Sequence, residues 1–333
     1  MKEALFYKKI NPGQVQCFLC SHYCQVSDQE FGFCKVRQNR DQVLYSHNYG
    51  KLISWAVDPV EKKPLYHFLP GSSAFSIAAP GCNFRCQFCQ NWQISQSSLS
   101  ECAALKDVQP GEVLKLALAS HSACIAYTYT EPTVFFEYAF DIAQLAKVNN
   151  IRNIFVTNGF ISPQAIRQIS PCLDAANIDL KSFNDVFYRK VCSGALKPVL
   201  DSIRLMKELG IWVEVTTLVI PGENDSADEL KKIAGFICSV DRNIPWHVSG
   251  FYGAYKFLKR RHTPEDTLKQ AVDIGNAAGL RYVYAGNLAG HGNITYCSAC
   301  RKELIKRQGF AVIENNLEGD RCVFCKTQLA GVF

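Results

Sequence analysis

The sequence lacks several features that would assign it to a class at once. It has no run approaching the roughly 18 apolar residues of a spanning helix, so no membrane partner is expected. The opening stretch, MKEALFYKKINPGQ, has no apolar segment followed by a small-residue cleavage site, so no signal peptide is predicted. Lys plus Arg (36) only slightly exceed Asp plus Glu (30), which does not by itself indicate nucleic-acid binding. We therefore expect a cytoplasmic protein.

Cysteine, by contrast, is abundant, with 16 in 333 residues. In a long chain without a signal peptide, closely spaced cysteines indicate metal or redox chemistry rather than disulfides. Most fall into three groups: Cys17, Cys20, Cys24 and Cys34; Cys82, Cys86 and Cys89; and Cys297, Cys300, Cys322 and Cys325. These groups predict a Cys-rich N-terminal metal-binding extension (1–72), a main domain (73–290) and a C-terminal zinc-ribbon or rubredoxin-like module (291–333).

The main domain shows an alternation of short apolar runs and longer amphipathic stretches. The runs, which are typical of buried parallel strands, are 74–79, 124–129, 152–157, 175–180, 212–220, 246–251 and 281–286. Six or seven strand-then-helix units predict an α/β fold, a partial parallel barrel of the (β/α)6 type. In such a fold, ligands bind at the carboxyl ends of the strands.

Two of the intervening helices have clear start signals. Ser226 and Glu229 have the spacing of a capping box. In the last helix, Thr263 is predicted to cap, Pro264 to occupy the first helical position and Gly279 to end the helix.

The segment GCNFRCQFCQNW (81–92) directly follows the first predicted parallel strand, and it contains three cysteines rather than four. Closed zinc sites and ordinary iron–sulfur clusters use four protein ligands. Three thiolates can hold three irons of a 4Fe–4S cubane and leave the fourth iron open. The missing cysteine therefore indicates a place where a substrate or cofactor binds iron. The alternative is a zinc site with a distant fourth ligand, or three buried cysteines.

This C-x3-C-x2-C spacing, with Phe88 before the third cysteine, resembles the signature of radical S-adenosylmethionine (SAM) enzymes. The resemblance implies that Cys82, Cys86 and Cys89 hold a 4Fe–4S cluster whose open iron is chelated by SAM. It further implies reductive cleavage of SAM to a 5′-deoxyadenosyl radical, which abstracts hydrogen from a substrate.

Later strand ends resemble segments of the pyruvate formate-lyase activating enzymes. They are YTYTEPT (127–133), VTNGF (156–160) and NIDLK (177–181). The resemblance implies that Glu131, Asn158, Asp179 and Lys181, together with Phe88, contact SAM. An alternative for Asp179 and Lys181 is a simple salt bridge at a strand end. Val156 departs from the acidic residue that precedes the TNG segment in those enzymes.

Over nearly its whole length the chain is identified as a member of the AmmeMemoRadiSam system radical SAM enzymes. DPVEKKPLYHFLPGS (58–72) and GNLAGHGNITYCSAC (286–300) carry this match. It implies AMMECR-domain and Memo-like proteins as companions and a reductant such as flavodoxin or ferredoxin. A protein or peptide is one candidate substrate class, and the substrate itself is not implied.

The outer cysteine groups each offer four thiols. The C-terminal C-x2-C pairs, Cys297/Cys300 and Cys322/Cys325, are separated by a segment that can form a hairpin, a pattern that indicates a structural zinc. The N-terminal Cys17, Cys20, Cys24 and Cys34 fit either zinc or an auxiliary iron–sulfur cluster, and of the two the sequence slightly favours zinc.

Two residues beyond these groups are weaker candidates for the radical site. Cys192 follows the 177–181 strand end, and His291 lies between glycines; each could line the site or be structural. A rival hypothesis is a zinc-ribbon nucleic-acid-binding protein, or a radical enzyme that modifies RNA. Only one short basic run, KFLKRRHTP (256–264), favours nucleic acid, so we expect no nucleic-acid partner.

Overall fold

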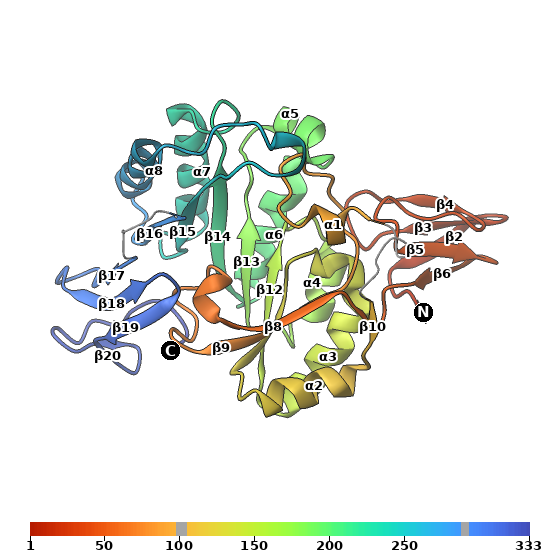
Figure 1. The fold of residues 1–333 in the computed structure, drawn as a ribbon, viewed down its shortest axis with the longest axis horizontal. Coiled ribbons are helices and arrows are strands. Elements are labelled where there is room, and N and C mark those ends of the chain that lie inside the picture. Colours follow the sequence, from red (N-terminus) through yellow and green to blue (C-terminus); the bar gives the residue numbers. More distant parts are fainter. Residues whose placement is uncertain (98–104, 288–292) are drawn as a thin grey trace.

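The computed structural model describes residues 1–97, 105–287 and 293–333, and a large parallel sheet forms its centre (Figure 1). The sheet has eight strands in the order β16-β15-β14-β13-β12-β11-β9-β8. All neighbours are parallel except β8 (Ser54–Pro59), which pairs antiparallel with β9. The parallel strands are β9 (Ser73–Ala78), β11 (Cys124–Tyr127), β12 (Arg152–Thr157), β13 (Ala175–Asp179), β14 (Trp212–Val219), β15 (Trp246–Gly250) and β16 (Val283–Gly286). This confirms the predicted partial barrel of parallel strands.

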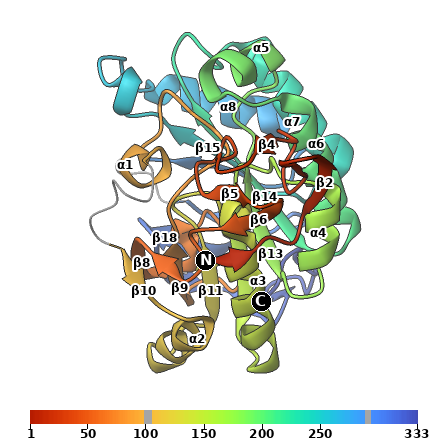
Figure 2. The same cartoon turned by 90° about the vertical axis from the view of Figure 1, so that its right-hand side faces the viewer.

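Helices connect the strands and pack along one face of the sheet, as Figure 2 shows for α3, α4, α6 and α7. They are α1 (Trp92–Ser95), α2 (Pro110–Ala119), α3 (Phe136–Val148), α4 (Pro163–Ile169), α5 (Asp185–Phe187), α6 (Leu196–Glu208), α7 (Ala227–Val240) and α8 (Glu265–Ala277). Shorter helical turns are η1 (Val60–Lys62), η3 (Pro132–Phe135), η4 (Tyr188–Cys192) and η5 (Tyr255–Phe257). Within the described residues, no helix combines the length and apolarity needed to cross a bilayer.

The amino-terminal half of the sheet's other face is covered by the segment that follows β8. Val60, Leu65 and Phe68 are fully buried there against small side chains of the parallel strands, including Ala74 and Ala126. Because the strands are apolar on both faces, they pack helices on one side and this segment on the other. Lys62 and Lys63 of this segment also line the cavity at the carboxyl ends of the strands.

Residues 1–52 form small antiparallel sheets beside the central one. Their strands are β1 (Lys2–Glu3), β2 (Tyr7–Asn11), β3 (Gln14–Cys17), β4 (Gln25–Ser27), β5 (Arg37–Arg40), β6 (Val43–Ser46) and β7 (Lys51–Leu52), the last paired with β10 (Lys106–Asp107). Phe6, Val15 and Val36 belong to the same hydrophobic core as the barrel. The N-terminal extension is therefore packed onto the barrel rather than hinged from it.

The C-terminal residues form a second small unit on the opposite side of the sheet (Figure 1). Its strands are β17 (Thr295–Tyr296), β18 (Glu303–Gln308), β19 (Ala311–Asn315), β20 (Leu317–Glu318) and β21 (Arg321–Cys322). β18 and β19 form the predicted hairpin. Leu304 and Ile305 pack with Tyr282 and Tyr284 beside β16, so this unit also shares a core with the barrel.

The helix-start predictions are partly wrong. Ser226 caps α7 by accepting from the Glu229 N–H (3.3 Å), but the Glu229 carboxylate accepts from Ser182 and the Phe183 N–H instead of completing a capping box. Helix α8 begins at Glu265, one residue later than predicted. The Thr263 hydroxyl is engaged elsewhere, since it donates to the Val219 carbonyl (2.6 Å) and accepts from the Phe251 N–H (2.7 Å). Tertiary contacts between strand ends prevail here over local capping.

Candidate active site

A cavity of about 340 Å³ lies at the carboxyl ends of the parallel strands, where the fold class predicts a ligand site. Every residue predicted for the cluster and for SAM lines it: Cys82, Cys86, Cys89, Phe88, Glu131, Asn158, Asp179 and Lys181. Its volume lies within the range of about 300–1,000 Å³ that is usual for small-molecule pockets. Residues up to a hundred positions apart in the sequence therefore converge on one space.

The three-cysteine loop is held in place mainly by its backbone. The Arg85 and Gln87 N–H groups donate to the carbonyls of Cys192 (2.8 Å) and Val191 (3.0 Å). Gly81, just before Cys82, has φ +104°, and a Cβ there would lie 2.8 Å from a Val36 methyl. Only glycine fits this close approach, which lets the N-terminal extension support the loop from behind.

The three thiols face the cavity in different surroundings. Cys82 Sγ accepts from the Phe84 N–H (3.3 Å), and Cys89 Sγ lies 3.2 Å from Ser95 Oγ. A hydrogen bond with Cys192, and then burial, raise the pKa of the Cys86 thiol. Burial also raises the pKa of the Cys82 thiol well above its ordinary value. Thiolates in such a site need a cationic partner, and iron supplies one, so the donor set fits the predicted cluster.

Glu131 is a buried organiser of the loop that follows β12. It is 1% exposed, and its carboxylate accepts four hydrogen bonds: from the Thr133 N–H (3.0 Å) and hydroxyl (2.6 Å), the Thr157 hydroxyl (2.7 Å) and the Asn158 N–H (2.8 Å). Asn158 in turn donates to Asn83 Oδ1 (2.8 Å), beside Cys82. Glu131 thus links β11, β12 and the cysteine loop, a role that the family resemblance did not imply.

Asp179 and Lys181 form the opposite, more open wall of the cavity. Lys181 Nζ donates to Asp179 Oδ2 (2.8 Å) and lies 5.7 Å from the centre of the Phe88 ring. The Asp179 side chain is 36% exposed. Burial opposes the charge on Lys181, but Asp179 and Cys86 together raise its pKa. The salt bridge considered as an alternative therefore exists, and it exists inside the cavity rather than away from it.

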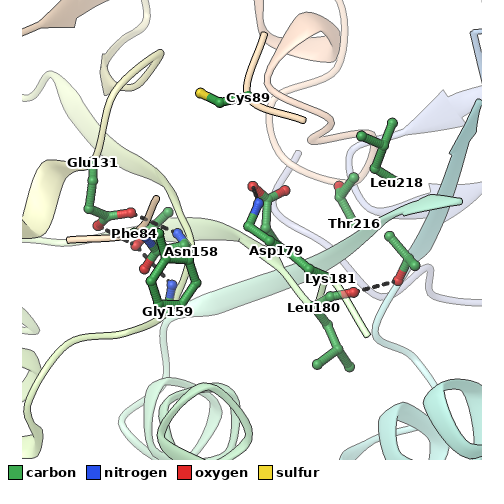
Figure 3. A network of polar contacts seen from close by, with 12 residues as sticks. Phe84, Cys89, Glu131, Asn158, Gly159, Asp179, Leu180, Lys181, Thr216 and Leu218 are labelled. Carbon is green, nitrogen blue, oxygen red and sulfur yellow. Dashed lines mark hydrogen bonds and ion pairs between the residues drawn. The ribbon is translucent and has the colours of Figure 1, made fainter. Parts of the chain in front are cut away.

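Figure 3 shows how these side chains lie. Glu131 and Asn158 stand together on one side, Asp179 stands on a neighbouring strand end, and Cys89 lies across an open space from them. Thr216 and Leu218, from β14, extend the wall beyond Asp179.

A further polar group, which was not predicted, also reaches the cavity: two lysines of the N-terminal extension and a tyrosine that follows β11. These residues are Lys62, Lys63 and Tyr129. Asp58 accepts from Lys62 (2.7 Å), from Lys63 (2.6 Å) and from the Tyr129 hydroxyl. Burial opposes its charge, but these donors lower the pKa of Asp58. The sequence signal for these residues is the pair of lysines directly after the extended segment that forms β8. The antiparallel pairing of β8 with β9, which brings the lysines to the cavity, was not predicted.

The departures from the activating-enzyme pattern also appear in the structure. Val156 lines the cavity, so its wall is apolar where those enzymes carry an acid. From β15 the cavity receives Ser249. Tyr252, in the segment that follows β15, is half exposed, and its hydroxyl donates to the Asn287 carbonyl (3.0 Å).

The two outer cysteine groups differ in how closely their thiols approach. In the C-terminal group, the Cys297–Cys325 and Cys300–Cys322 sulfurs are 3.6 and 3.8 Å apart. In the N-terminal group, Cys17, Cys20, Cys24 and Cys34 line one small enclosed cavity. Among the weaker candidates, Cys192 is fully buried behind Cys86. His291 lies outside the described residues.

Comparison with known proteins agrees with this geometry. The model of the Radical SAM superfamily matches residues 76–237, which span the three-cysteine loop and the strands up to α7. An uncharacterised protein of Methanocaldococcus jannaschii is 43% identical over 98% of both chains. The chain therefore belongs to the radical SAM superfamily, whose members use a 4Fe–4S cluster and SAM.

More distant similarities are consistent with the same assignment. The pyruvate formate-lyase-activating enzyme of Clostridium pasteurianum is 23% identical over 51% of this chain and 74% of its own. The crystal structure of Streptococcus suis SuiB bound to S-adenosylmethionine has a TM-score of 0.52 at 11% identity, covering 69% of this chain and 53% of that one. The fold is thus shared well beyond recognisable sequence similarity.

Proposed function

We propose that this protein is a SAM-cleaving radical enzyme whose cluster is held by Cys82, Cys86 and Cys89. One observation carries the proposal: the three thiols and the polar side chains of four successive strand ends line a single cavity. When bound there, the reduced cluster would supply the electron that cleaves SAM to methionine and a 5′-deoxyadenosyl radical. Hydrogen abstraction from a substrate would follow.

The two walls of the cavity have different tasks in this proposal. Asp179 is partly exposed and would accept hydrogen bonds from hydroxyl or amino groups of SAM. Lys181 would hold Asp179 ionised and place a positive charge near the cysteine loop. Glu131, saturated by four donors, would act by fixing Asn158 rather than by binding SAM directly.

For the substrate, we propose a protein or peptide, as in the activating enzymes. The similarity to a pyruvate formate-lyase-activating enzyme supports this class. We keep the AmmeMemoRadiSam system as the proposed context, with AMMECR-domain and Memo-like proteins as companions and flavodoxin or ferredoxin as the reductant. We also propose that the C-terminal thiols bind zinc, because their spacing suits a single tetrahedral ion.

The test is an anaerobic assay of 5′-deoxyadenosine and methionine from SAM with dithionite. The wild-type protein should form both products in equal amounts. Cys86→Ala should abolish them, because the cluster loses one of three ligands. The matched control is Cys172→Ser, which changes a half-buried cysteine that lines a separate pocket near the start of β13 and should leave turnover unchanged. Product formation by Cys86→Ala at the wild-type rate would refute the proposal.

A further inference from the structure

The N-terminal cysteines are not needed for the function proposed above, and they pose a separate question. Cys17, Cys20, Cys24 and Cys34 come from β3 and the loops around β4, and they surround one enclosed cavity together with Arg37. Four cysteines suit either a zinc ion or an iron–sulfur cluster. A zinc ion and an iron–sulfur cluster differ in size, so the distances between the four sulfurs distinguish a zinc site from a cluster site.

A single zinc ion requires its four sulfurs to lie close together. Zn–S bonds of about 2.3 Å place the sulfurs of a tetrahedral site about 3.8 Å apart. The C-terminal group meets this requirement, with Sγ–Sγ distances of 3.6 and 3.8 Å. All four of its sulfurs lie within 4.8 Å of one another.

The N-terminal group does not meet it. Across residues 1–97, 105–287 and 293–333, the C-terminal set is the one group of three or more cysteine, histidine or acidic residues with ligand atoms this close. No three thiols among Cys17, Cys20, Cys24 and Cys34 are therefore within 4.8 Å of each other, although all four line the same cavity.

The three-cysteine loop of the active site provides an internal reference. Cys82, Cys86 and Cys89 also line one cavity, and within the described residues their three sulfurs do not all lie within that distance of one another. In a cubane cluster each thiolate binds a different iron, so the sulfurs stay farther apart than around one ion. The N-terminal thiols share the wide spacing of the loop that serves a cluster, not the tight spacing of the C-terminal group.

Arg37 provides a second, independent observation. Its side chain is 2% exposed, and Nη2 is paired with Glu137. In the part of the chain that the structure describes, Nε and Nη1 find no hydrogen-bond partner, although both are buried in a residue that lines the cavity. Buried donors of this kind are costly unless an acceptor is present. The thiolates of a metal centre, and the sulfides of a cluster, are such acceptors, so Arg37 indicates an anionic group in this cavity and the thiol spacing decides its kind.

His22 is not available as a metal ligand through Nε2. This nitrogen donates to the Asn83 carbonyl (2.7 Å), next to Cys82, and the ring packs on Phe33 and Phe160. His22 is therefore half-buried between the two sites rather than solvated. It connects the N-terminal cavity to the active-site loop and leaves the four thiols as the ligand set.

From the wide thiol spacing and the unpaired donors of Arg37, we infer that Cys17, Cys20, Cys24 and Cys34 bind a second iron–sulfur cluster of the 4Fe–4S type. The protein then carries two clusters that differ in ligation: one with four cysteines in the N-terminal extension and one with three in the barrel. Zinc belongs to the C-terminal module alone.

The experiment is a metal count with Mössbauer spectroscopy on the full-length protein, purified and reconstituted without oxygen. The inference predicts about eight irons, all in 4Fe–4S clusters, and about one zinc per chain. About four irons with either two zincs or one would overturn it, as would a Mössbauer signal from a single iron in four thiolates that persists in Cys300→Ser.

Variants assign the second cluster without requiring catalysis. The triple variant Cys82→Ala/Cys86→Ala/Cys89→Ala should retain about four irons with a 4Fe–4S spectrum. Adding Cys20→Ala should remove them. The control Cys300→Ser should lose the zinc and keep all the iron. An iron-free triple variant that still binds two zincs would contradict the inference, and the wild-type count stands even if a variant fails to fold.

Discussion

The two ends of the parallel sheet both carry polar side chains, and they are used differently. Toward the amino ends of the strands, Glu214 is fully buried and accepts from the N–H groups of Tyr66 (3.0 Å) and His67 (2.8 Å), from Trp212 Nε1 (3.0 Å) and from His247 Nε2 (2.6 Å). Two residues further along β14, toward the carboxyl ends, Thr216 lines the cavity together with the partly exposed Asp179.

This contrast separates residues that hold the fold from residues that meet a ligand. At the amino ends of the strands, the sealed end, every hydrogen bond to the Glu214 carboxylate comes from the protein, so loss of this carboxylate should affect stability. At the carboxyl ends, the open end, Asp179 can accept hydrogen bonds from a ligand, so loss of its carboxylate should affect ligand binding. The same division explains Glu131, which lines the cavity but is satisfied like Glu214.

The largest effect is expected at the sealed end. Glu214→Gln removes the carboxylate that pairs with His247 and receives two backbone donors, and it should lower the free energy of unfolding by about 3–5 kcal/mol. Chemical denaturation measures this change. The exposed Glu208→Gln, at the end of α6, is the matched control and should change stability little. An unchanged free energy of unfolding for Glu214→Gln would mean that this carboxylate does not stabilise the fold as described.

The next effect concerns the C-terminal thiols. Cys322→Ser should remove one zinc per chain and lower Tm by several degrees, because the proposed ion would close a unit that shares a core with β16. Zinc analysis and thermal unfolding, with Cys172→Ser as the control, test this. Unchanged zinc content in Cys322→Ser would argue against a zinc at this site.

At the open end, Asp179→Asn should weaken SAM binding by about 10- to 100-fold, the size expected for one charge-assisted hydrogen bond. Stability should stay within about 1 kcal/mol, since the side chain is partly exposed. Titration of SAM into the protein that carries its reconstituted cluster gives the affinity for SAM. Asp201→Asn, in an exposed ion pair with Lys197, is the control. Full affinity in Asp179→Asn would place SAM elsewhere in the cavity.

The smallest effect is a pH dependence at the sealed end. Burial lowers the pKa of His67 to about 4. The unfolded chain takes up a proton near pH 6.5 and the folded chain does not, so stability should fall as pH drops from about 6.5 toward 4.

His67→Gln should remove this contribution, roughly 2 kcal/mol between pH 7 and 5. Denaturation curves at both pH values measure it, with the exposed His121→Gln as the control. If His67→Gln and the wild-type protein lose the same stability, His67 is not the group responsible.

The sequence predicted the parts of the fold whose signals are local. The seven parallel strands are apolar on both faces and therefore stand out as short runs, and the cysteine spacings are visible directly. Strand β8 was missed because Trp55 and Val57 face outward on it and its partner β9 follows only after the turn through η1. Its pairing is what brings Lys63 to the cavity.

The roles of individual site residues were harder to predict for a similar reason. Glu131 is near Asn158 only because β11 and β12 are neighbours in the sheet. Thr263 and Glu229 are committed to contacts across strand ends and not to their own helices. Such contacts depend on the assembled sheet, which no local pattern encodes.

The most direct test of the central claim is the electron paramagnetic resonance spectrum of the reduced protein before and after addition of SAM. The Cys20→Ala variant gives the cleanest sample, since only the barrel cluster should remain. If the cluster held by Cys82, Cys86 and Cys89 has one iron without a cysteine ligand, SAM should bind that iron and change the g values of the signal. A spectrum that is unchanged at saturating SAM would contradict the account.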